Sequence, residues 1–495
     1  MKHFFSLLLS VLVAFALVGC KNEYRKVIPS DAVLVSELNL GKMAVKADLP
    51  NQKEAFMQFM QEVQMDNELL EEVQELVNNP RQTGIDFMNP MYAFVCMIDK
   101  QPIPFFLMPV SNKKKLINAL DDDDYKLTFS EEDKMTFFRM DSEFGGVITD
   151  KVLLMGMASS NTLKQLLSKE NTDNNFFDTE AGQFMNSHKG DIALEFNAAA
   201  IPANAKEVIW QLIVEENQAL AQTPQVKEAY DKLMKSQLMA NLNFDKGAIR
   251  MGLFARTNED IVSYNAKKID EAYFDYLPSE QLLCVAALGL DGAAYWQMAG
   301  ETLKPYMEGE MAPIMQVVAD YIQTLNGTAA VAAYAQESID DPSVTIVLPS
   351  PKKAMDEMLN AFEEEMPRTL AYAGDEKITV ISTDKNYQMQ KNTQRPYKVK
   401  GSDMLYAYAN MSLFTDIVEK KVAAQESGRA NYLRTYRKNY YESLINFFRQ
   451  ADYVELNAER NNELNLTLTM TDNTRNALAI VVARGLDVLT QSAKR

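Results

Sequence analysis

Residues 28–40, Ile-Pro-Ser-Asp-Ala-Val-Leu-Val-Ser-Glu-Leu-Asn-Leu, contain the pattern on which the plan of this chain depends. A proline and two small polar residues lead into an apolar run, which predicts a β-strand over Ala32–Leu40. The same arrangement returns at Leu277-Pro278-Ser279-Glu280, again ahead of an apolar run. The recurrence predicts that the fold begun at residue 28 is built a second time.

Three further segments recur in the same order along the chain. Leu107-Met108-Pro109 returns as Val347-Leu348-Pro349, Lys189-Gly190-Asp191 returns as Lys400-Gly401-Ser402-Asp403, and a hairpin over Leu238–Phe244 and Ala248–Ala255 returns over Tyr453–Ala458 and Glu463–Met470. The separation is 249 residues from Pro29 to Pro278 but 211 from Gly190 to Gly401. The second half therefore lacks a unit, and its missing counterpart is expected near Gly145–Leu167.

These patterns predict an α+β fold made of two tandem pseudo-repeats, residues 28–272 and the shorter 273–495. The hairpins and alternating runs indicate a mainly antiparallel sheet in each repeat. Apolar residues at helical spacing over Lys53–Asn78 indicate helices packed on the sheets. The regular order of the matched segments favours a duplication over chance similarity.

The N-terminus has the features of an export signal. After Lys2, an apolar run of 15 residues covers Phe4–Val18, which is shorter than the roughly 20 residues that a membrane-spanning helix needs. The run ends in Leu17-Val18-Gly19-Cys20, which resembles the lipobox of bacterial lipoproteins. We expect residues 1–19 to be removed between Gly19 and Cys20, and residues 20–27 to form a tether lipidated on Cys20. The alternative is an ordinary signal peptide followed by a chance cysteine.

The residue after Cys20 bears on localisation. Lipoprotein sorting, by resemblance, uses an aspartate there to retain a protein at the inner membrane, and this chain has Lys21. We therefore expect a lipid anchor in the outer membrane.

Composition excludes some classes of function. Removal of residues 1–19 takes away one cation, Lys2, so the formal charge changes from −18 to −19. Such a chain would repel nucleic-acid phosphates, so no nucleic-acid partner is expected. Apart from Cys20 the chain has two cysteines, Cys96 and Cys284, both in apolar, strand-like runs. We expect both thiols to be buried, reduced and apart.

Candidate catalytic and metal-binding residues are few. His188 is the only histidine after the signal, which excludes paired-histidine metal sites and favours a solvated loop residue. The acidic runs Asp121–Asp124 and Glu131–Asp133, and the polar run Asn171–Asn175, lack the spacing of a calcium loop. Glu195 comes closest to a carboxylate in an apolar strand, but alternation with Leu194 and Phe196 favours solvent exposure. No catalytic, cofactor-binding or metal-binding residue is predicted.

The lipobox, the Ile28-Pro29-Ser30-Asp31 segment and the repeated strand–helix plan resemble a Bacteroidota lipoprotein family catalogued only as a domain of unknown function. The resemblance implies an envelope lipoprotein and no catalytic residues. Surface-displayed lipoproteins of that phylum often carry an acidic run after the cysteine. This chain has Lys21-Asn22-Glu23-Tyr24-Arg25 there, which favours the periplasmic face of the outer membrane over the cell surface.

Two classes of function remain open. The first is a non-enzymatic binding or structural role with a partner protein, glycan or lipid. The alternative is an envelope hydrolase that uses carboxylates. The polar segment Thr383–Lys400 lies where the second repeat lacks its unit, and we expect it to cover an open sheet edge. That face of the second repeat, or the groove between the repeats, is the expected interaction surface.

Overall fold

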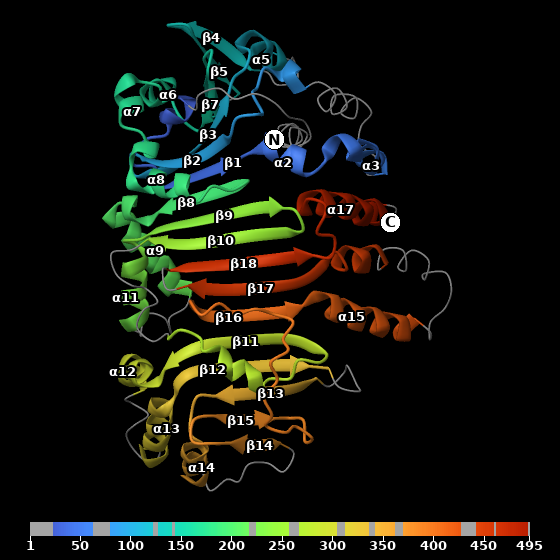
Figure 1. Cartoon of the computed structure of the whole chain (residues 1–495). Coiled ribbons are helices and arrows are strands. Elements are labelled where there is room, and N and C mark those ends of the chain that lie inside the picture. Colours follow the sequence, from blue (N-terminus) through green and yellow to red (C-terminus); the bar gives the residue numbers. More distant parts are fainter. Residues whose placement is uncertain are drawn as a thin grey trace. The chain divides into compact units, whose positions relative to one another are not determined.

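A computed structural model of the chain describes residues 23–62, 80–121, 127–140, 144–216, 224–256, 267–303, 312–335, 342–361, 370–426, 442–459 and 462–493. The chain forms two compact units, whose elements are labelled in Figure 1. Unit 1 spans Met1–Arg256, Tyr432–Phe447 and Asp472–Arg495, and unit 2 spans Thr257–Asn431 and Phe448–Thr471. Both units combine helices with a large antiparallel sheet, so the predicted α+β class is confirmed.

The sheet of unit 1 has the strand order β4-β5-β6-β7-β3-β2-β1-β8-β9-β10, and every neighbouring pair is antiparallel. The strands are β1 (Leu34–Leu38), β2 (Met91–Ile98), β3 (Gln101–Pro109), β4 (Thr128–Glu132), β5 (Met135–Arg139), β6 (Gly145–Ile148), β7 (Val152–Gly156), β8 (Ile192–Asn197), β9 (Gln237–Asp245) and β10 (Ala248–Arg256).

Helices surround this sheet. They are η2 (Glu23–Val27), α2 (Leu40–Lys46), α3 (Leu49–Glu62), η3 (Pro80–Thr83), α5 (Lys113–Leu120), α6 (Ser160–Leu166), α7 (Lys169–Asp173), η4 (Phe176–Asp178), α8 (Glu180–Ser187), η5 (Ala198–Ala200), α9 (Ala203–Glu216) and α11 (Pro224–Leu233). The segment between β7 and β8 covers one sheet face, because Leu163 of α6, Phe176 of η4 and Met185 of α8 are buried against strand residues such as Phe94. Burial of these large side chains is the main stabilising contribution to unit 1.

Helix α17 (Ala477–Ala493), the last described element of the chain, belongs to unit 1 and contacts α2, α3, β9 and β10. The Gln52 side-chain amide donates to the backbone carbonyl of Ala479 at 2.8 Å. Leu478 is buried beside Phe244 and Ala47. The first unit is therefore completed by a segment from the end of the sequence.

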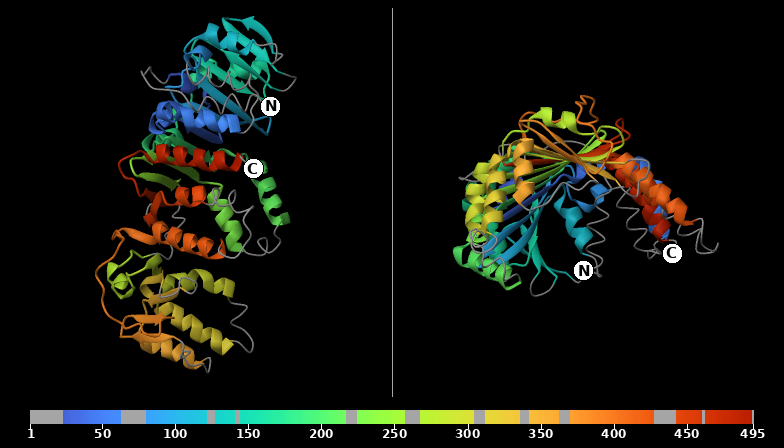
Figure 2. Two further views of the ribbon diagram at one scale, coloured as in Figure 1. Left: turned by 90° about the vertical axis from the view of Figure 1, so that its right-hand side faces the viewer. Right: turned by 90° about the horizontal axis from the view of Figure 1, so that it is seen from below.

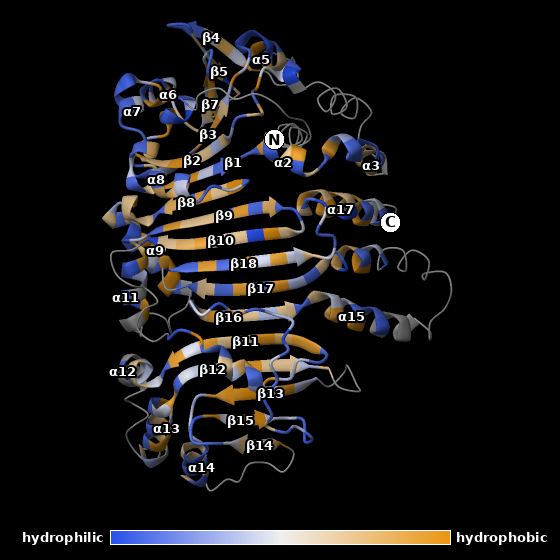
Figure 3. Cartoon of the chain, viewed as in Figure 1, coloured by the Kyte–Doolittle hydropathy of each residue, from blue (hydrophilic) through white to orange (hydrophobic). Residues whose placement is uncertain are grey.

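The sheet of unit 2 has the strand order β18-β17-β16-β11-β12-β13-β15-β14, again with antiparallel neighbours. Its strands are β11 (Leu282–Asp291), β12 (Asn326–Tyr334), β13 (Ser343–Leu348), β14 (Ala371–Gly374), β15 (Thr379–Ser382), β16 (Asp403–Asn410), β17 (Ala451–Glu459) and β18 (Glu463–Met470). Figure 3 shows β13 and β15 coloured mainly as hydrophobic, whereas β18 has hydrophilic stretches.

The helices of unit 2 are η6 (Glu271–Tyr276), α12 (Gly292–Leu303), α13 (Ala312–Thr324), α14 (Lys352–Ala361) and α15 (Met411–Glu426). Figure 2 shows α12–α15 on one side of this sheet, and η6 with the connection from β15 to β16 on the other. We call that connection, residues 383–402, the strap. The strap, η6 and the strands enclose the core of unit 2.

Both expected hairpins are present, as β9–β10 and β17–β18. Their turns use residues in the left-handed region, Gly247 with φ of 66° and Asn462 with φ of 57°, as tight hairpins require. Asn461 lies outside the described residues. The expected helix Lys53–Asn78 is described as far as Glu62, as part of α3.

The two cysteines differ in exposure, and for Cys284 the expectation of burial is wrong. Cys96 is 5% exposed, whereas Cys284 is exposed. A register shift between Leu282 and Cys284 inserts one residue into β11, so that Val285, rather than Cys284, faces the core. A slip of one residue moves a side chain to the opposite sheet face, which is the physical reason for the error.

Candidate functional site

The strap lies against the face of the unit 2 sheet and does not cover its edge, where the sequence had suggested it. The edge strand is the short β14. Tyr397 and Val399 of the strap are 5% and 7% exposed, within the same core cluster as Tyr406 and Tyr408 of β16. The Tyr397 ring centroid lies 5.5 Å from that of Tyr408. The C-terminal half of the strap is therefore part of the hydrophobic core.

Polar contacts fix the rest of the strap to η6 and to the residues that lead into β11. The backbone N–H of Asn392 donates to the carbonyl of Asp275 at 2.6 Å, and its side-chain amide donates to the Ser279 hydroxyl at 2.5 Å. Arg395 forms an ion pair with Asp275 and donates to the carbonyl of Glu271 at 3.0 Å. These contacts join segments more than a hundred positions apart in the sequence.

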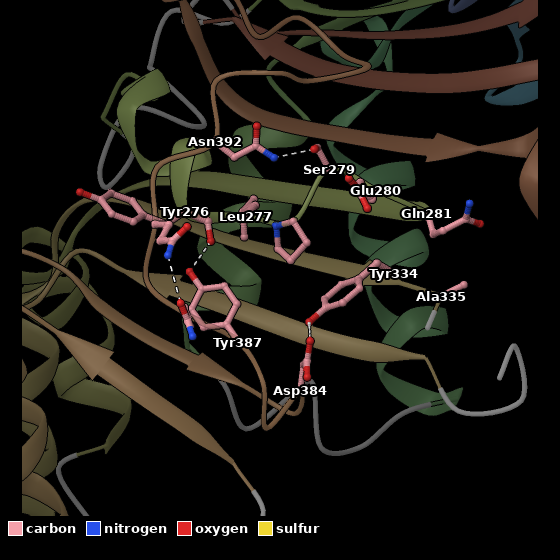
Figure 4. Close-up of a pocket in the computed structure, with 13 residues that line it drawn as sticks. Tyr276, Leu277, Ser279, Glu280, Gln281, Tyr334, Ala335, Asp384, Tyr387 and Asn392 are labelled. Carbon is pink, nitrogen blue, oxygen red and sulfur yellow. Dashed lines mark hydrogen bonds between the residues drawn. The ribbon is translucent and has the colours of Figure 1, made fainter. Parts of the chain in front are cut away.

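A pocket of about 500 Å³ lies between the strap, the end of η6 and the end of β12 (Figure 4). Its lining combines tyrosines, carboxylates, side-chain amides and a few small or apolar residues, namely Tyr276, Leu277, Pro278, Ser279, Glu280, Gln281, Tyr334, Ala335, Asp384, Tyr387, Gln388, Gln390 and Asn392. The buried members are Leu277, Tyr334 and Ala335, whereas Glu280, Gln281, Gln388 and Gln390 are exposed. The pocket thus has a largely apolar base and a polar rim.

Hydrogen bonds orient the tyrosines of the pocket. The Tyr387 hydroxyl donates to the carbonyl of Tyr276 at 2.7 Å, and the Tyr334 hydroxyl points to Asp384, whose Oδ2 lies 3.4 Å away (Figure 4). Burial, followed by the neighbouring Tyr334 and Tyr276, raises the pKa of Tyr387 to about 12. The Tyr387 phenol is therefore neutral at physiological pH, and acts as a hydrogen-bond donor.

The arrangement is suited to binding and lacks the geometry of acyl-transfer catalysis. Ser279 is the one hydroxyl of a serine or threonine among the lining residues, and its partner is the Asn392 amide, which is not a general base. The lining contains no histidine, cysteine or lysine. Among the described residues, no three His, Cys, Asp or Glu side chains lie together so as to hold a metal ion.

The structure corrects the expectation for Glu195. Strand alternation does place Glu195 opposite Leu194, but the face it occupies is the core face, and Leu194 is the residue that is 37% exposed. Glu195 is fully buried between Val35 of β1 and Met239 of β9. Neither carboxylate oxygen has a hydrogen-bond partner among the described residues, and burial raises the pKa of Glu195 to about 8.

His188 is also less exposed than the sequence suggested. It follows α8 and is half-buried, with its ring centroid 4.5 Å from that of Phe184 and 4.3 Å from that of Phe254. Its Nδ1 lies 2.8 Å from the Ser187 hydroxyl and 3.0 Å from the carbonyl of Phe184. These neighbours give His188 a packing role at the end of α8.

The acidic and polar runs have structural partners where they are described. Residues 122–124 of the first acidic run lie outside the described residues. In the second, Glu132 pairs with Lys164 and Glu131 accepts from the Thr136 hydroxyl at 3.3 Å. In Asn171–Asn175, the Asn171 amide donates to the carbonyls of Val27 and Leu166, both at 2.8 Å. This run therefore fixes the cover of the unit 1 core.

Sequence reasoning did not identify the residues of the pocket, although it selected Thr383–Lys400 as an unusual segment. The signal available was the mixture of tyrosine and amide residues in Asn386-Tyr387-Gln388-Met389-Gln390. Nothing in the sequence paired that stretch with Tyr276 or Tyr334. Gly19 and Cys20, the expected cleavage and lipidation residues, lie outside the described residues. Within the described part of the chain, no helix is both long enough and apolar enough to cross a membrane.

Comparison with known proteins gives a family and no activity. A family model described as "Domain of unknown function (DUF4836)" matches residues 24–453. No curated protein sequence matches the chain. Crystal form I of TP0453 is similar with 9% identity over 49% of this chain and 81% of that chain, at a TM-score of 0.25. Crystal form III of TP0453 is similar with 10% identity over 48% of this chain and 80% of that chain, at a TM-score of 0.26. Scores this low do not establish a shared fold.

Proposed function

Because the chain belongs to the DUF4836 family, a domain of unknown function, we propose its function from its own residues. It is a lipid-anchored cell-envelope lipoprotein with a non-enzymatic binding role, and the pocket beneath the strap is its binding site. The predicted resemblance to a family of unknown function is confirmed by the family match. An origin in Bacteroidota stays a prediction.

The proposed anchor is lipid on Cys20 after cleavage behind Gly19. The support is the sequence Leu17-Val18-Gly19-Cys20 after an apolar run too short to span a membrane. Two or three acyl chains make a durable anchor, since each buried CH₂ contributes about 0.8 kcal/mol. Lys21 supports the outer membrane, and the absence of an acidic run after the cysteine supports its periplasmic face.

The observation that carries the binding role is the built pocket itself. One wall of the pocket is the strap, which is held in place by backbone and side-chain hydrogen bonds from Asn392 and Arg395. The lining combines tyrosine rings with polar side chains at the rim. Sites for small ligands are typically concave, of about 300–1,000 Å³, with a few placed polar groups. The same residues lack a paired nucleophile and base, which supports binding over turnover.

The hydrolase alternative has one observation in its favour, the raised pKa of Glu195. A glycosidase needs two carboxyl groups flanking a substrate. Glu195 is fully buried in unit 1, with Arg256 as the charge that acts on its pKa, and it does not line the pocket. We therefore prefer a binding role.

A site-specific photo-crosslinker tests the binding role in cells that make the full, membrane-tethered chain. p-Benzoylphenylalanine at Gln388, on the pocket rim, is expected to form an adduct with an envelope component. The matched control places it at Asp320, which is exposed on α13 of the same unit. The adduct should disappear when Tyr387→Ala is added. Equal yields at Gln388 and Asp320, or an adduct indifferent to Tyr387→Ala, would show that the pocket is not the site.

We also propose that the chain arose by tandem duplication, with repeats at 28–272 and 273–495. Strand order supports this, because β10-β9-β8-β1-β2-β3-β7-β6 of unit 1 matches β18-β17-β16-β11-β12-β13-β15-β14 of unit 2 strand for strand. Each repeat also has a buried aspartate at the start of the matched strand. Asp191 immediately precedes β8, and Asp403 is the first residue of β16. On this matching, the described part of the second repeat holds no counterpart of the β4–β5 hairpin or of the helices α6–α8. Within the expected Gly145–Leu167, α6 belongs to this set, whereas β6 and β7 match β14 and β15.

A further inference from the structure

We propose that the pocket beneath the strap binds a neutral glycan, through stacking on tyrosine and hydrogen bonds to sugar hydroxyls. This inference rests on the proposed binding role and names its ligand class. The pocket lies wholly within unit 2, between the strap, η6 and β12. Four features of its lining carry the inference, namely its aromatic surface, its hydrogen-bonding groups, its charge and its rigidity.

The aromatic surface comes from Tyr276, Tyr334 and Tyr387. A pyranose ring presents a patch of C–H groups on one face, and such a face packs against the electron-rich face of an aromatic ring. Tyr276 and Tyr387 are half-buried, so part of each ring is available to a ligand, whereas Tyr334 is 6% exposed and forms the base. Lys391 lies 5.9 Å from the ring centroid of Tyr276, which makes Tyr387 the freer platform.

The polar lining matches a polyhydroxylated ligand. Asp384 and Glu280 are acceptors, and the amides of Gln281, Gln388, Gln390 and Asn392 carry both donors and acceptors. Part of this capacity is used within the strap, because the Gln390 amide donates to Gln388 Oε1 at 3.0 Å and Asn392 Oδ1 accepts from the Gln394 N–H at 3.0 Å. The remaining N–H groups and carboxylate oxygens of the rim can bond to sugar hydroxyls. Planar carboxylate and amide groups can contact two neighbouring hydroxyls in a bidentate geometry. Aliphatic surface is limited, because Leu277, Pro278 and Ala335 are the residues of that kind in the lining, so an acyl chain would find little apolar contact there.

The charge of the pocket disfavours anionic ligands. The lining holds two carboxylates, Asp384 and Glu280, and no arginine, lysine or histidine. Arg395, the nearest strap cation to Asp275, is committed to an ion pair with that residue. A phosphorylated or sulfated ligand would be repelled by these two carboxylates, and Lys391, whose Nζ lies 5.9 Å from the Tyr276 ring centroid, offsets one of the two charges. A neutral glycan carries no such penalty, and a cationic peptide is the competing class that the experiment must separate.

The pocket is organised before a ligand arrives. The bond from Tyr387 to the carbonyl of Tyr276 and the bond from Asn392 to Ser279 hold the strap against the end of η6 and the residues that lead into β11. A site whose rings are already fixed loses less conformational entropy on binding. The Tyr387 ring is therefore already oriented for stacking, and the ligand does not have to order it on binding.

The test measures binding of defined probes to the purified full-length mature protein. Chitotetraose, maltotetraose and cellotetraose serve as neutral glycans, tetralysine as the cationic probe and inorganic phosphate as the anionic probe, with titration calorimetry and saturation-transfer NMR as readouts. At least one neutral tetrasaccharide is expected to bind, and phosphate is not. Tyr387→Ala should weaken binding about tenfold, Tyr387→Phe by no more than about threefold, and Asp384→Asn about tenfold. Tyr295→Ala, an exposed tyrosine of α12 outside the pocket, should leave binding unchanged.

Two results would overturn the glycan assignment, namely binding of tetralysine alone, and tetrasaccharide binding that Tyr387→Ala leaves intact. The crosslinking adduct at Gln388 separates this failure from failure of the binding role. A periodate-sensitive, protease-resistant adduct supports a glycan. A protease-sensitive adduct, with no tetrasaccharide bound, refutes the glycan and leaves the pocket as a binding site. Absence of both adduct and probe binding refutes the proposed function as well.

Discussion

Among single residues, Glu195 has the largest expected effect on how stability depends on pH. Its carboxyl group is fully buried without a hydrogen-bond partner among the described residues, and its pKa is about 8 in the folded chain. The folded state binds this proton more tightly than the unfolded state, where glutamate titrates near pH 4.3. The stabilising effect of the proton is therefore complete below about pH 4 and is lost as pH rises to about 8.

We expect Glu195→Gln to remove this dependence. Between pH 5 and pH 8 the wild-type free energy of unfolding should fall by about 3–4 kcal/mol more than that of the variant. Urea unfolding at a series of pH values measures the difference. Glu228→Gln, at an exposed glutamate paired with Lys232, is the control and should follow the wild type. Parallel curves for wild type and Glu195→Gln would mean that Glu195 is ionised or solvated in the folded chain.

The two thiols should react at different stages of unfolding. Cys284 is exposed and should be alkylated by iodoacetamide in the folded protein, whereas Cys96 is buried and its pKa is raised to about 12, chiefly by burial. Mass spectrometry of the purified chain carrying Cys20→Ala should show one adduct before denaturation and two after it. Modification of both thiols at the same rate in native buffer would contradict the burial of Cys96.

At the residue scale, the sequence predicted alternation correctly and assigned the wrong face in two places. Glu195 was expected in solvent because it alternates with the apolar Leu194 and Phe196, yet the face of β8 that it occupies is covered by α8 and η4. Cys284 was expected in the core, and one inserted residue in β11 placed it on the opposite face. Segments that are distant in the sequence decide which sheet face the helices pack on and where a strand contains a β-bulge.

Among the elements, the strap contributes residues both to the hydrophobic core of unit 2 and to the lining of the pocket. Tyr397 is buried against Phe274, Tyr406 and Tyr408, with ring centroids 5.7, 5.9 and 5.5 Å away. Tyr397→Ala should destabilise unit 2 by about 3–5 kcal/mol, because it leaves a cavity beneath the strap. Tyr397→Phe keeps the ring and should cost less than about 1.5 kcal/mol. Thermal unfolding of both variants measures this, and equal melting temperatures would show that the strap is not part of the core.

The hairpins were predictable from sequence because a hairpin is a local structure. Residues on both sides of Asp245-Lys246-Gly247 alternate, and the turn itself needs a residue with positive φ, which Gly247 supplies. The pocket was not predictable, because it depends on contacts such as that from Tyr387 to Tyr276, 111 positions apart. The position of the strap on the sheet face had no local signal, since its polar composition equally fits an edge cover.

For the whole molecule, the proposed lipid anchor on Cys20 predicts where the chain is found in the cell. Cys20→Ser should leave the membrane fraction or accumulate as uncleaved precursor, because serine cannot be lipidated in this way. Cys284→Ser, which also removes an exposed thiol, should stay membrane-bound. Fractionation followed by immunoblotting distinguishes the two. A mature, membrane-bound Cys20→Ser protein would show that another segment holds the chain to the membrane.

Helix α17 sets an order for folding. A ribosome makes α2, α3, β9 and β10 long before α17, yet Gln52 donates to the carbonyl of Ala479 on that helix. Ala47 and Phe244 are buried beside Leu478 of the same helix. Before residues 477–493 are synthesised, the apolar side chains around Phe244 lack the contacts that α17 makes with them. The packing of unit 1 around Leu478 therefore cannot form until residues 477–493 have been synthesised. A nonsense mutation shortly before codon 477 would leave Ala47 and Phe244, which lie far earlier in the sequence, without this packing partner.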